Sequence, residues 1–350
     1  MRRGISSARR ALLRGARLLP IACVAALTVP IASASANVLP PLAASLTDPG
    51  PAMGNDAIGS TAAPTGGGVP LSNHRTGGVN TGLPDSMCGA IQWPDPGPPG
   101  AGVSTSAMGS DAPAYYEVGE PIGGFAGRAP RGVMLLIHGG AWAATGAGGV
   151  GTERADADRW RARGWRTVNL TYRPCNASFG DVRWFYDRAR TLWGSNLPYC
   201  AAGASAGGNL ALMLAASRPS VSCVVDYAGP TDGLSIEHER TSSGGTDGPR
   251  LAYNLLVAAV GREMVVWWSP ALFPIRARVL FALAANEPYV PWDQGTELRR
   301  RLRAANPAAY VDLLGLDAGS THWVHSNVDP ASLQALYHHE EQLVAPLLGG

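Results

Sequence analysis

The segment that most constrains the fold of this chain is Gly203-Ala204-Ser205-Ala206-Gly207-Gly208. It follows a short apolar run over residues 197–202 and precedes an apolar, helix-like run over residues 209–216. Together these runs predict a strand, a tight turn with Ser205 at its apex, and a helix. Such a turn strains the serine backbone and needs neighbours with almost no side chain. It presents the hydroxyl at a helix N-terminus, where free N–H groups and the helix dipole favour developing negative charge.

A second apolar run, over residues 133–137, predicts a central parallel strand that is buried on both faces. It ends in His138-Gly139-Gly140-Ala141-Trp142. Glycines directly after a strand allow the backbone to turn sharply and to point N–H groups into a cleft. Together with the N–H group of Ala206, these groups predict an oxyanion hole.

With these two segments the chain resembles the α/β-hydrolase superfamily, and within it the esterases with an HGG-type oxyanion motif (hormone-sensitive-lipase-like and acetylxylan- or feruloyl-esterase-like members). The resemblance covers roughly residues 112–347 and implies the α/β-hydrolase fold. The chain has His-Gly-Gly-Ala-Trp where these esterases have the HGGG form. The N–H groups of Gly139, Gly140 and Ala141 therefore all remain candidates for the oxyanion hole, beside that of Ala206.

Strands and helices alternate from Tyr115 onward, which predicts a mostly parallel sheet with helices on both faces, in a catalytic domain over residues 111–350. Residues 230–270 interrupt the alternation with a polar loop and an apolar helical run. This insertion is expected either to cap the site or to be a surface excursion without substrate contact. The expected strands are 115–118, 133–138, 165–172, 198–204, 221–227, 278–285 and 309–315, and the expected helices are 152–163, 181–194, 207–217, 293–305 and 330–346.

Residues 1–36 have the pattern of an export signal, with an Arg-rich start, an apolar stretch and the small residues Ala34-Ser35-Ala36. Arg9-Arg10 is compatible with a twin-arginine signal, and a lipoprotein cut before Cys23 is the alternative. The apolar stretch is too short and too interrupted by proline to form a stable membrane span. We therefore expect a secreted or periplasmic protein. Residues 37–110, rich in Pro and Gly, are expected to be irregular and ordered only around Cys88.

The charge balance gives no indication of nucleic-acid binding. All 28 basic residues are arginine, and six of them lie in the first 17 residues. Without residues 1–36 the chain has 22 basic and 26 acidic residues, a net charge of about −4. No phosphate-binding glycine motif and no CxxC metal framework is present in the sequence. We therefore expect no cofactor and no metal.

Four cysteines remain after removal of the signal, an even number that suggests two disulfides in an oxidising compartment. Cys200 and Cys223 lie at comparable heights on consecutive predicted strands, within disulfide reach if those strands are neighbours. Cys88 would then pair with Cys175. In the alternative interpretation, Cys200 and Cys223 are two small buried apolar residues.

Seven histidines are present, and a nucleophilic serine needs one of them as its base. In the α/β-hydrolase fold the order is Ser, acid, His, each at a strand end. His322 and His325 follow the last predicted strand, and the Gly-x-x-His pattern favours His322. The other histidines lie elsewhere, at His74, His138, His238, His338 and His339.

The acid should follow the predicted strand over residues 278–285. Glu287, in Glu287-Pro288-Tyr289-Val290-Pro291, resembles the acid position of the family, where Asp is usual. Asp293 is an alternative that fits a helix N-cap equally well. Asp232, after the strand that follows the nucleophile, is the third candidate.

These residues favour a secreted carboxylic ester hydrolase that acts through an acyl-enzyme on a small-molecule or polymer-linked ester. Trp142 would form a wall of the substrate pocket, or alternatively pack in the core. Competing functions are an acyltransferase, a serine peptidase of the prolyl-oligopeptidase type, and a catalytically dead hydrolase fold that serves as a binding module. Ester specificity depends on pocket shape, which the sequence does not encode locally.

Overall fold

The computed structural model of the chain describes residues 88–89, 91–236, 247–317, 322 and 329–349. All of them belong to one compact unit, Leu39–Gly350. The expected export signal and most of the Pro/Gly-rich segment lie outside the described residues. So do the histidines His74, His238 and His325.

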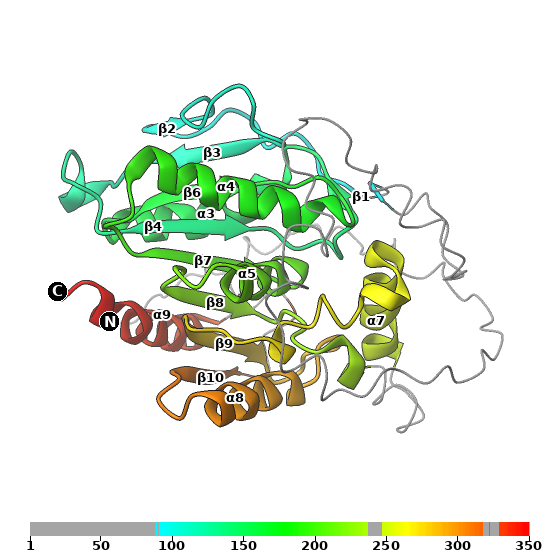
Figure 1. Cartoon of the computed structure of the whole chain (residues 1–350). Coiled ribbons are helices and arrows are strands. Elements are labelled where there is room, and N and C mark those ends of the chain that lie inside the picture. The colour runs from blue at the N-terminus through cyan, green and yellow to red at the C-terminus, as the bar shows by residue number, and fades with distance from the viewer. Residues whose placement is uncertain (1–87, 90, 237–246, 318–321, 323–328, 350) are drawn as a thin grey trace, which may run out of the picture. The chain divides into compact units, whose positions relative to one another are not determined.

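Eight strands form the main sheet in the order β10-β9-β8-β7-β4-β6-β3-β2 (Figure 1). Every neighbouring pair from β6 to β10 is parallel, and β3 and β2 join antiparallel at one edge. The predicted mostly parallel sheet is confirmed, and each strand expected from the sequence lies within about two residues of its predicted bounds. The strands are β2 (Val103–Ser104), β3 (Tyr116–Gly119), β4 (Val133–Ile137), β6 (Arg166–Leu170), β7 (Tyr199–Ala204), β8 (Cys223–Tyr227), β9 (Arg278–Ala284) and β10 (Val311–Leu316).

Helices cover both faces of this sheet, as the alternation predicts. On one face α3 packs on β4 and β6, and α9 on β9 and β10. On the other face α5 packs on β7 and β8, with α4 beside it and α8 on β10. The main helices are α3 (Gly149–Ala162), α4 (Ala177–Trp193), α5 (Ala206–Ser217), α7 (Asp247–Val260), α8 (Asp293–Ala305) and α9 (Pro330–Val344).

Strand β4 shows how the sheet divides the interior into two cores. All five of its residues are buried, and their side chains alternate between the faces. Leu135 belongs to the core beneath α4 and α5, and Met134 and Leu136 belong to the core beneath α3 and α9. A fully buried side chain of this size stabilises the fold by about 1.5–3 kcal/mol. The continuous apolar run is therefore what a strand covered on both faces requires.

The Pro/Gly-rich segment contributes strands that the sequence did not predict. Besides β2, the two residues of β1 (Ile91–Gln92) pair in parallel with β5 (Ala144–Thr145) in a separate small sheet. The intervening backbone is held by arginines of α3, since Arg154 Nη1 donates to the Pro96 carbonyl at 2.5 Å and Arg161 Nη2 to that of Ala101 at 2.8 Å. Two-residue strands are too short to produce a periodic pattern, which explains why the sequence analysis missed them.

The insertion over residues 230–270 contains α7, which lies beyond the carboxyl ends of β7 and β8 in Figure 1. Its apolar side chains Leu256 and Val257 are buried in the same core as Trp268. The helix is therefore anchored to the domain by apolar packing. The loop over residues 237–246 lies outside the described residues.

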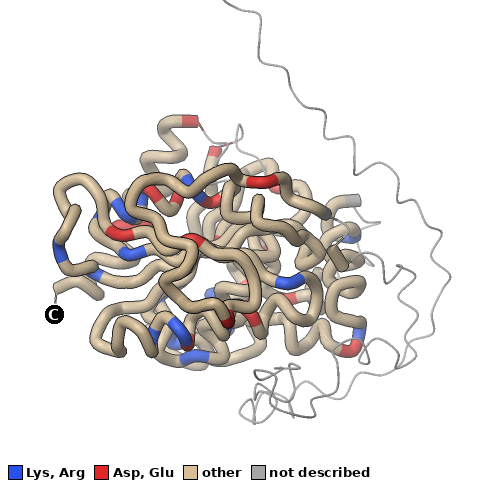
Figure 2. Tube along the Cα trace, turned by 90° about the horizontal axis from the view of Figure 1, so that it is seen from above, with Lys and Arg blue, Asp and Glu red and all other residues tan. Residues whose placement is uncertain are grey.

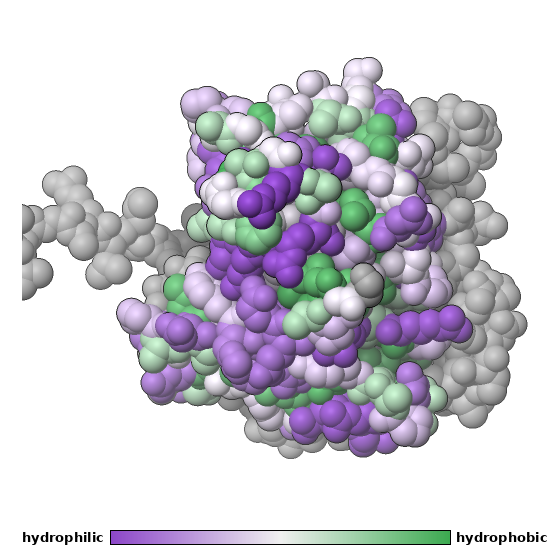
Figure 3. Space-filling model, turned by 90° about the vertical axis from the view of Figure 1, so that its left-hand side faces the viewer, coloured by the Kyte–Doolittle hydropathy of each residue, from purple (hydrophilic) through white to green (hydrophobic). Residues whose placement is uncertain are grey.

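Charged residues of both signs are interspersed along the described chain (Figure 2). The face shown in Figure 3, the left-hand side of Figure 1, mixes hydrophilic and hydrophobic residues. Several ion pairs are partly exposed, such as that of Arg300 with Glu297, and contacts of this kind contribute about 0–1 kcal/mol each. One buried acidic residue, in contrast, contacts two arginines at once.

That residue is Glu340 of α9, which joins α9 to α3 and β8. One carboxylate oxygen accepts a hydrogen bond from the Tyr227 hydroxyl at 2.6 Å, and the other contacts Arg159 and lies 2.9 Å from Arg163 Nη1. Burial lowers the pKa of Arg159. The carboxylates of Glu340 and Asp156 raise it by more than burial lowers it, so the pKa is well above its ordinary value. The two guanidinium groups therefore share this carboxylate, in addition to the contacts of Arg159 with Asp156 and of Arg163 with Glu341.

Replacing Glu340 is expected to lower the free energy of unfolding more than replacing a surface charge does. Glu340→Gln removes the buried carboxylate that Arg159 and Arg163 share, which leaves Arg159 with Asp156 and Arg163 with Glu341. The expected loss is about 3 kcal/mol, at the lower end of what breaking a buried ion pair costs. Glu341→Gln is the matched control, because Glu341 contacts Arg163 from a side chain that is 49% exposed. Urea denaturation should give a change below about 1 kcal/mol for the control. Equal losses in the two variants would contradict the assignment.

Candidate active site

Ser205 occupies the turn between β7 and α5 with φ = 55° and ψ = −121°. This is a left-handed conformation that costs a non-glycine residue about 1–3 kcal/mol, so the surrounding structure must maintain it. The Ser205 N–H donates to the Tyr227 carbonyl at 2.8 Å, and its carbonyl accepts from the Asn209 N–H at 3.1 Å. The serine is thus held by β8 on one side and by α5 on the other.

The glycines that follow Ser205 are required by close packing. A Cβ at Gly207 would overlap the Ile137 carbonyl oxygen at the end of β4, and one at Gly208 would overlap the Asp226 carboxyl. The missing side chain of Gly207 therefore lets the helix begin directly against the end of β4. This contact places the Ser205 turn beside the turn over residues 138–142.

That second turn contains three consecutive residues with positive φ: 109° at Gly140, 55° at Ala141 and 57° at Trp142. The Gly140 carbonyl accepts from the N–H groups of Ala143 and Ala144, both at 3.0 Å. The first N–H groups of a helix have no partner within the helix. The N–H of Ala206, the first residue of α5, therefore has no partner within the helix. It lies at the same end of the sheet as the 138–142 turn, because β4 and β7 are parallel and end next to each other.

His138 supports this turn from within the core and does not face the solvent. Its ring is fully buried, stacks on Tyr172 with centroids 4.3 Å apart, and has Nδ1 2.6 Å from the Gly139 carbonyl. Burial lowers the pKa of His138, and only the Gly139 carbonyl and Glu153 oppose this. The neutral ring therefore donates its Nδ1–H to Gly139, while the Tyr172 hydroxyl donates to the same carbonyl at 3.1 Å.

Glu287 and His322 are brought together by the ends of two neighbouring strands. Glu287 follows β9 and His322 follows β10, and Glu287 Oε1 lies 2.8 Å from His322 Nδ1. The same oxygen accepts the N–H groups of Tyr289 at 2.8 Å and Val290 at 3.1 Å. These bonds orient the carboxylate, whose side chain is 2% exposed. The Tyr289 ring, which the sequence analysis did not single out, lies edge-on to the imidazole with centroids 5.0 Å apart.

The two alternative acids occupy other settings. Asp293 is the first residue of α8 and is exposed, while the N-cap position belongs to Trp292, so the N-cap interpretation of Asp293 is not observed. Asp232 is buried, accepts the N–H groups of Leu234 and Ser235, and lies 3.2 Å from Arg301 Nη2. Burial raises its pKa while Arg301 opposes the shift. These contacts describe a carboxylate that organises the start of the insertion.

Trp142 lies in the core. It is 2% exposed, meets Trp268 edge-on at 6.4 Å, and donates from Nε1 to Asn209 Oδ1 at 3.3 Å. The Asn209 amide nitrogen in turn donates to the carbonyls of Pro230 and Trp268. Asn209 thus joins the 138–142 turn to the insertion. Its signal in the sequence is a single amide at the start of an otherwise apolar helix.

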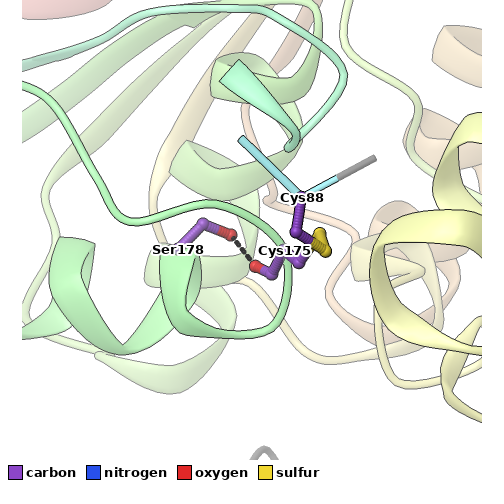
Figure 4. Close-up of a disulfide and its surroundings, with 3 residues drawn as sticks. All are labelled: Cys88, Cys175 and Ser178. Atoms are coloured by element: carbon purple, nitrogen blue, oxygen red, sulfur yellow. Dashed lines mark hydrogen bonds between the residues drawn. A yellow bond between two sulfur atoms is a disulfide. The ribbon is translucent and has the colours of Figure 1, made fainter. Parts of the chain in front are cut away.

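Both expected cysteine pairs are disulfides in the structure. Cys200 and Cys223 are register partners on β7 and β8, with Cα atoms 4.6 Å apart. Cys88 and Cys175, 87 residues apart in sequence, join the segment before β1 to the start of α4 (Figure 4). Within the described ranges, no group of three or more His, Cys, Asp or Glu side chains could hold a metal ion. None of the described helices is both long and apolar enough to cross a bilayer.

Asp226 of β8 is a fully buried carboxyl group beneath the start of α5. Its Oδ1 accepts the Gly229 N–H at 2.7 Å, and its Oδ2 has no hydrogen-bond partner among the described residues. Burial raises the pKa of Asp226 well above its ordinary range, against the opposing effect of the Gly229 N–H. Burial therefore favours the protonated form of this group in the folded protein.

No family model and no curated protein matches this chain. Among solved structures, EstE5 soaked with p-nitrophenyl butyrate is 16% identical, with a TM-score of 0.56 over 83% of this chain and 96% of that one. An esterase/lipase from an uncultured bacterium is 17% identical, with a TM-score of 0.55 and the same coverage. A bacterial heroin esterase is 19% identical, with a TM-score of 0.54 over 71% and 86%. Together with the strand order, these likenesses show the α/β-hydrolase fold.

Asp226 makes the stability of the fold depend on pH in a defined direction. The unfolded carboxyl ionises near pH 4, whereas the folded one ionises at a higher pH, so stability is lost as the pH rises from about 4 toward the raised pKa. In Asp226→Asn this loss is absent. Urea denaturation at pH 5 and pH 8 should show the variant gaining on the wild type at the higher pH, with a limiting slope of about 1.4 kcal/mol per pH unit. A difference between the proteins that is the same at both pH values would contradict the prediction.

Proposed function

We propose that this chain is a carboxylic ester hydrolase in which Ser205 is the nucleophile, His322 the general base and Glu287 the residue that orients it. The observation that carries the proposal is the 2.8 Å contact between Glu287 and His322, at the same end of the sheet as the strained Ser205 turn. The likeness in fold to proteins described as esterases supports the same class.

The reaction would follow from the hydrogen bond at His322 Nδ1. Because Nδ1 donates to Glu287, Nε2 is the ring nitrogen that takes the proton from the Ser205 hydroxyl as its oxygen attacks the ester carbonyl. The imidazolium then protonates the leaving alcohol, which yields an acyl-enzyme. A water molecule, activated by the same histidine, attacks the acyl carbonyl and releases the acid and Ser205.

Negative charge develops on the carbonyl oxygen during each attack. The N–H of Ala206 at the first turn of α5 would stabilise it, together with the N–H of Gly140 or Ala141 in the HGG-type turn. Each such donor is worth about 3–4 kcal/mol of transition-state stabilisation. Support for this assignment is the packing of Gly207 against Ile137, which brings the two turns together.

The insertion would limit access to the site from above the carboxyl ends of the strands. Its helix α7 is anchored through Leu256 and Val257. Asn209 joins the start of the insertion, at Pro230, to the 138–142 turn. We place the enzyme in a secreted or periplasmic compartment, because two disulfides are typical of an oxidising environment. The substrate class is small-molecule or polymer-linked esters, and the soak of EstE5 with p-nitrophenyl butyrate makes that ester the first substrate to test.

Covalent labelling tests the nucleophile directly. The wild type should react with a fluorophosphonate probe and hydrolyse p-nitrophenyl butyrate, whereas Ser205→Ala should lose both activities and keep its fold. Ser106→Ala, at an exposed serine before β3, should label like the wild type. Labelling is read from the intact mass and folding from circular dichroism. Persistence of the label in Ser205→Ala would show that another serine is the nucleophile.

Glu287→Gln tests the orienting acid. The amide can still accept from Tyr289 and Val290, but it no longer stabilises the imidazolium or selects the tautomer, so kcat should fall by about 10³–10⁴ with little change in KM. Glu287→Asp should also be impaired, because its carboxylate is one methylene shorter. Asp293→Asn should change kcat and the free energy of unfolding only slightly, since this residue is exposed at the start of α8. A severe loss of kcat in Asp293→Asn beside near-normal turnover in Glu287→Gln would transfer the role to Asp293.

A further inference from the structure

The 138–142 turn is strained, and contacts from outside it must maintain its conformation. Ala141 and Trp142 both have φ above 50°, where a residue with a side chain costs about 1–2 kcal/mol. Two such residues in succession do not persist without support from their surroundings. That support comes from two places, residues 88–89 with 91–93 and Cys175.

Residues 88–89 and 91–93 hold the chain directly after the turn. The Gly89 N–H donates to the Ala143 carbonyl at 2.8 Å, and the Trp93 N–H donates to the Thr145 carbonyl at 2.9 Å. Between these two bonds, β1 pairs in register with β5. The residues that leave the turn are therefore fixed by a parallel ladder to a segment about 50 residues earlier in the chain.

Trp93 also covers the turn itself. A Cβ placed on Gly140 would lie 3.6 Å from two atoms of the Trp93 indole, so the ring is in contact distance of this residue. The same ring meets His138 edge-on, with centroids 6.3 Å apart. One side chain of the N-terminal segment thus packs over both the entry and the middle of the turn.

Cys175 holds the turn from the other side. Its N–H donates to the Trp142 carbonyl at 2.5 Å, and its own carbonyl accepts from the Ser178 N–H at 3.0 Å and the Ser178 hydroxyl at 2.7 Å (Figure 4). Trp142 is therefore anchored to the first turn of α4 through Cys175. The disulfide to Cys88 joins this anchor covalently to the segment that carries Gly89 and Trp93.

We propose that the Cys88–Cys175 disulfide is a positioning element for the 138–142 turn, which would supply an oxyanion-hole N–H group. Reduction of this disulfide then lowers kcat reversibly. This inference rests on the proposed ester hydrolase function. Reduction by a dithiol passes two electrons to the disulfide. One thiolate of the reductant attacks a cysteine sulfur, which breaks the S–S bond and releases the other cysteine as a thiolate. The second thiolate of the reductant then attacks the reductant's own sulfur in the mixed disulfide, which releases the remaining cysteine thiolate and leaves the reductant as a cyclic disulfide. The loss of the covalent link frees Cys88 from Cys175 and releases the strained turn.

The second disulfide provides an internal control. Cys200 and Cys223 cross-link two central strands, are both at most 1% exposed, and lie in the core beneath α3 and α9. Cys88 is only half-buried. Removal of either disulfide should lower the melting temperature, but only the first disulfide acts on the turn.

The experiment compares Cys88→Ala/Cys175→Ala with Cys200→Ala/Cys223→Ala, using p-nitrophenyl butyrate well below the melting temperature of each protein. Loss of one oxyanion donor lowers kcat by about 10²–10³. A misplaced donor should therefore lower kcat of the first variant roughly 10–100-fold with KM changed less than about twofold. The control should keep kcat within about threefold. An unchanged kcat in the folded first variant, or an equal loss of kcat in both variants, overturns the proposal.

Two further measurements apply if the first variant does not fold. Trp93→Ala keeps the disulfide and should show the same loss of kcat at unchanged KM. Wild-type enzyme treated with dithiothreitol, with alkylated peptides mapped, should lose kcat in step with reduction of Cys88–Cys175 and regain it on reoxidation. Retention of kcat after this disulfide is reduced overturns the proposal. A wild type that neither hydrolyses the ester nor labels at Ser205 refutes the ester hydrolase function instead.

Discussion

The parallel hydrogen-bonded ladder of β4, β7 and β8 is the feature on which the rest of the structure depends. Its register pairs Ile137 with Gly203 and Ala204 with Tyr227, so that all three strands end at the same level. The Ser205 N–H extends the ladder to the Tyr227 carbonyl. A slip of one residue would turn each side chain of a strand to the other face and mix the two cores. The register therefore fixes the position of both turns at once.

Backbone strain in this protein gathers where these strands end. Five non-glycine residues among those described have positive φ, and all follow the carboxyl ends of adjoining strands: Ala141, Trp142, Cys175, Ser205 and Ala228. Strain of this kind is tolerated only where packing and hydrogen bonds determine the local conformation more strongly than the residue itself. Here that support combines the Gly207 contact, the neutral His138 ring and the two short strands β1 and β5.

The cost of burying a charge is offset in different ways at two buried carboxyl groups, Glu340 and Asp226. Glu340 meets two arginines and a tyrosine hydroxyl, so it is compensated by opposite charge and joins α9 to α3. Asp226 accepts a single N–H group and lies against Gly208, so burial favours its protonated form. The first arrangement stabilises the packing of α9 against α3. The second makes the stability of the fold beneath α5 depend on pH.

The sequence by itself determined the order of the strands and helices and the strained turn at Ser205, because apolar periodicity and glycine placement report burial and local backbone conformation. It placed Cys200 and Cys223 at comparable heights on consecutive strands, and the pairing of β7 with β8 in the structure joins them. Only the tertiary structure decided that Trp142 lies in the core, that Asp232 organises the insertion, and that Glu287 is the carboxylate beside His322. It alone revealed the strands of the Pro/Gly-rich segment. These outcomes depend on hydrogen bonds and packing between residues tens of positions apart, and no local pattern of residues encodes such contacts.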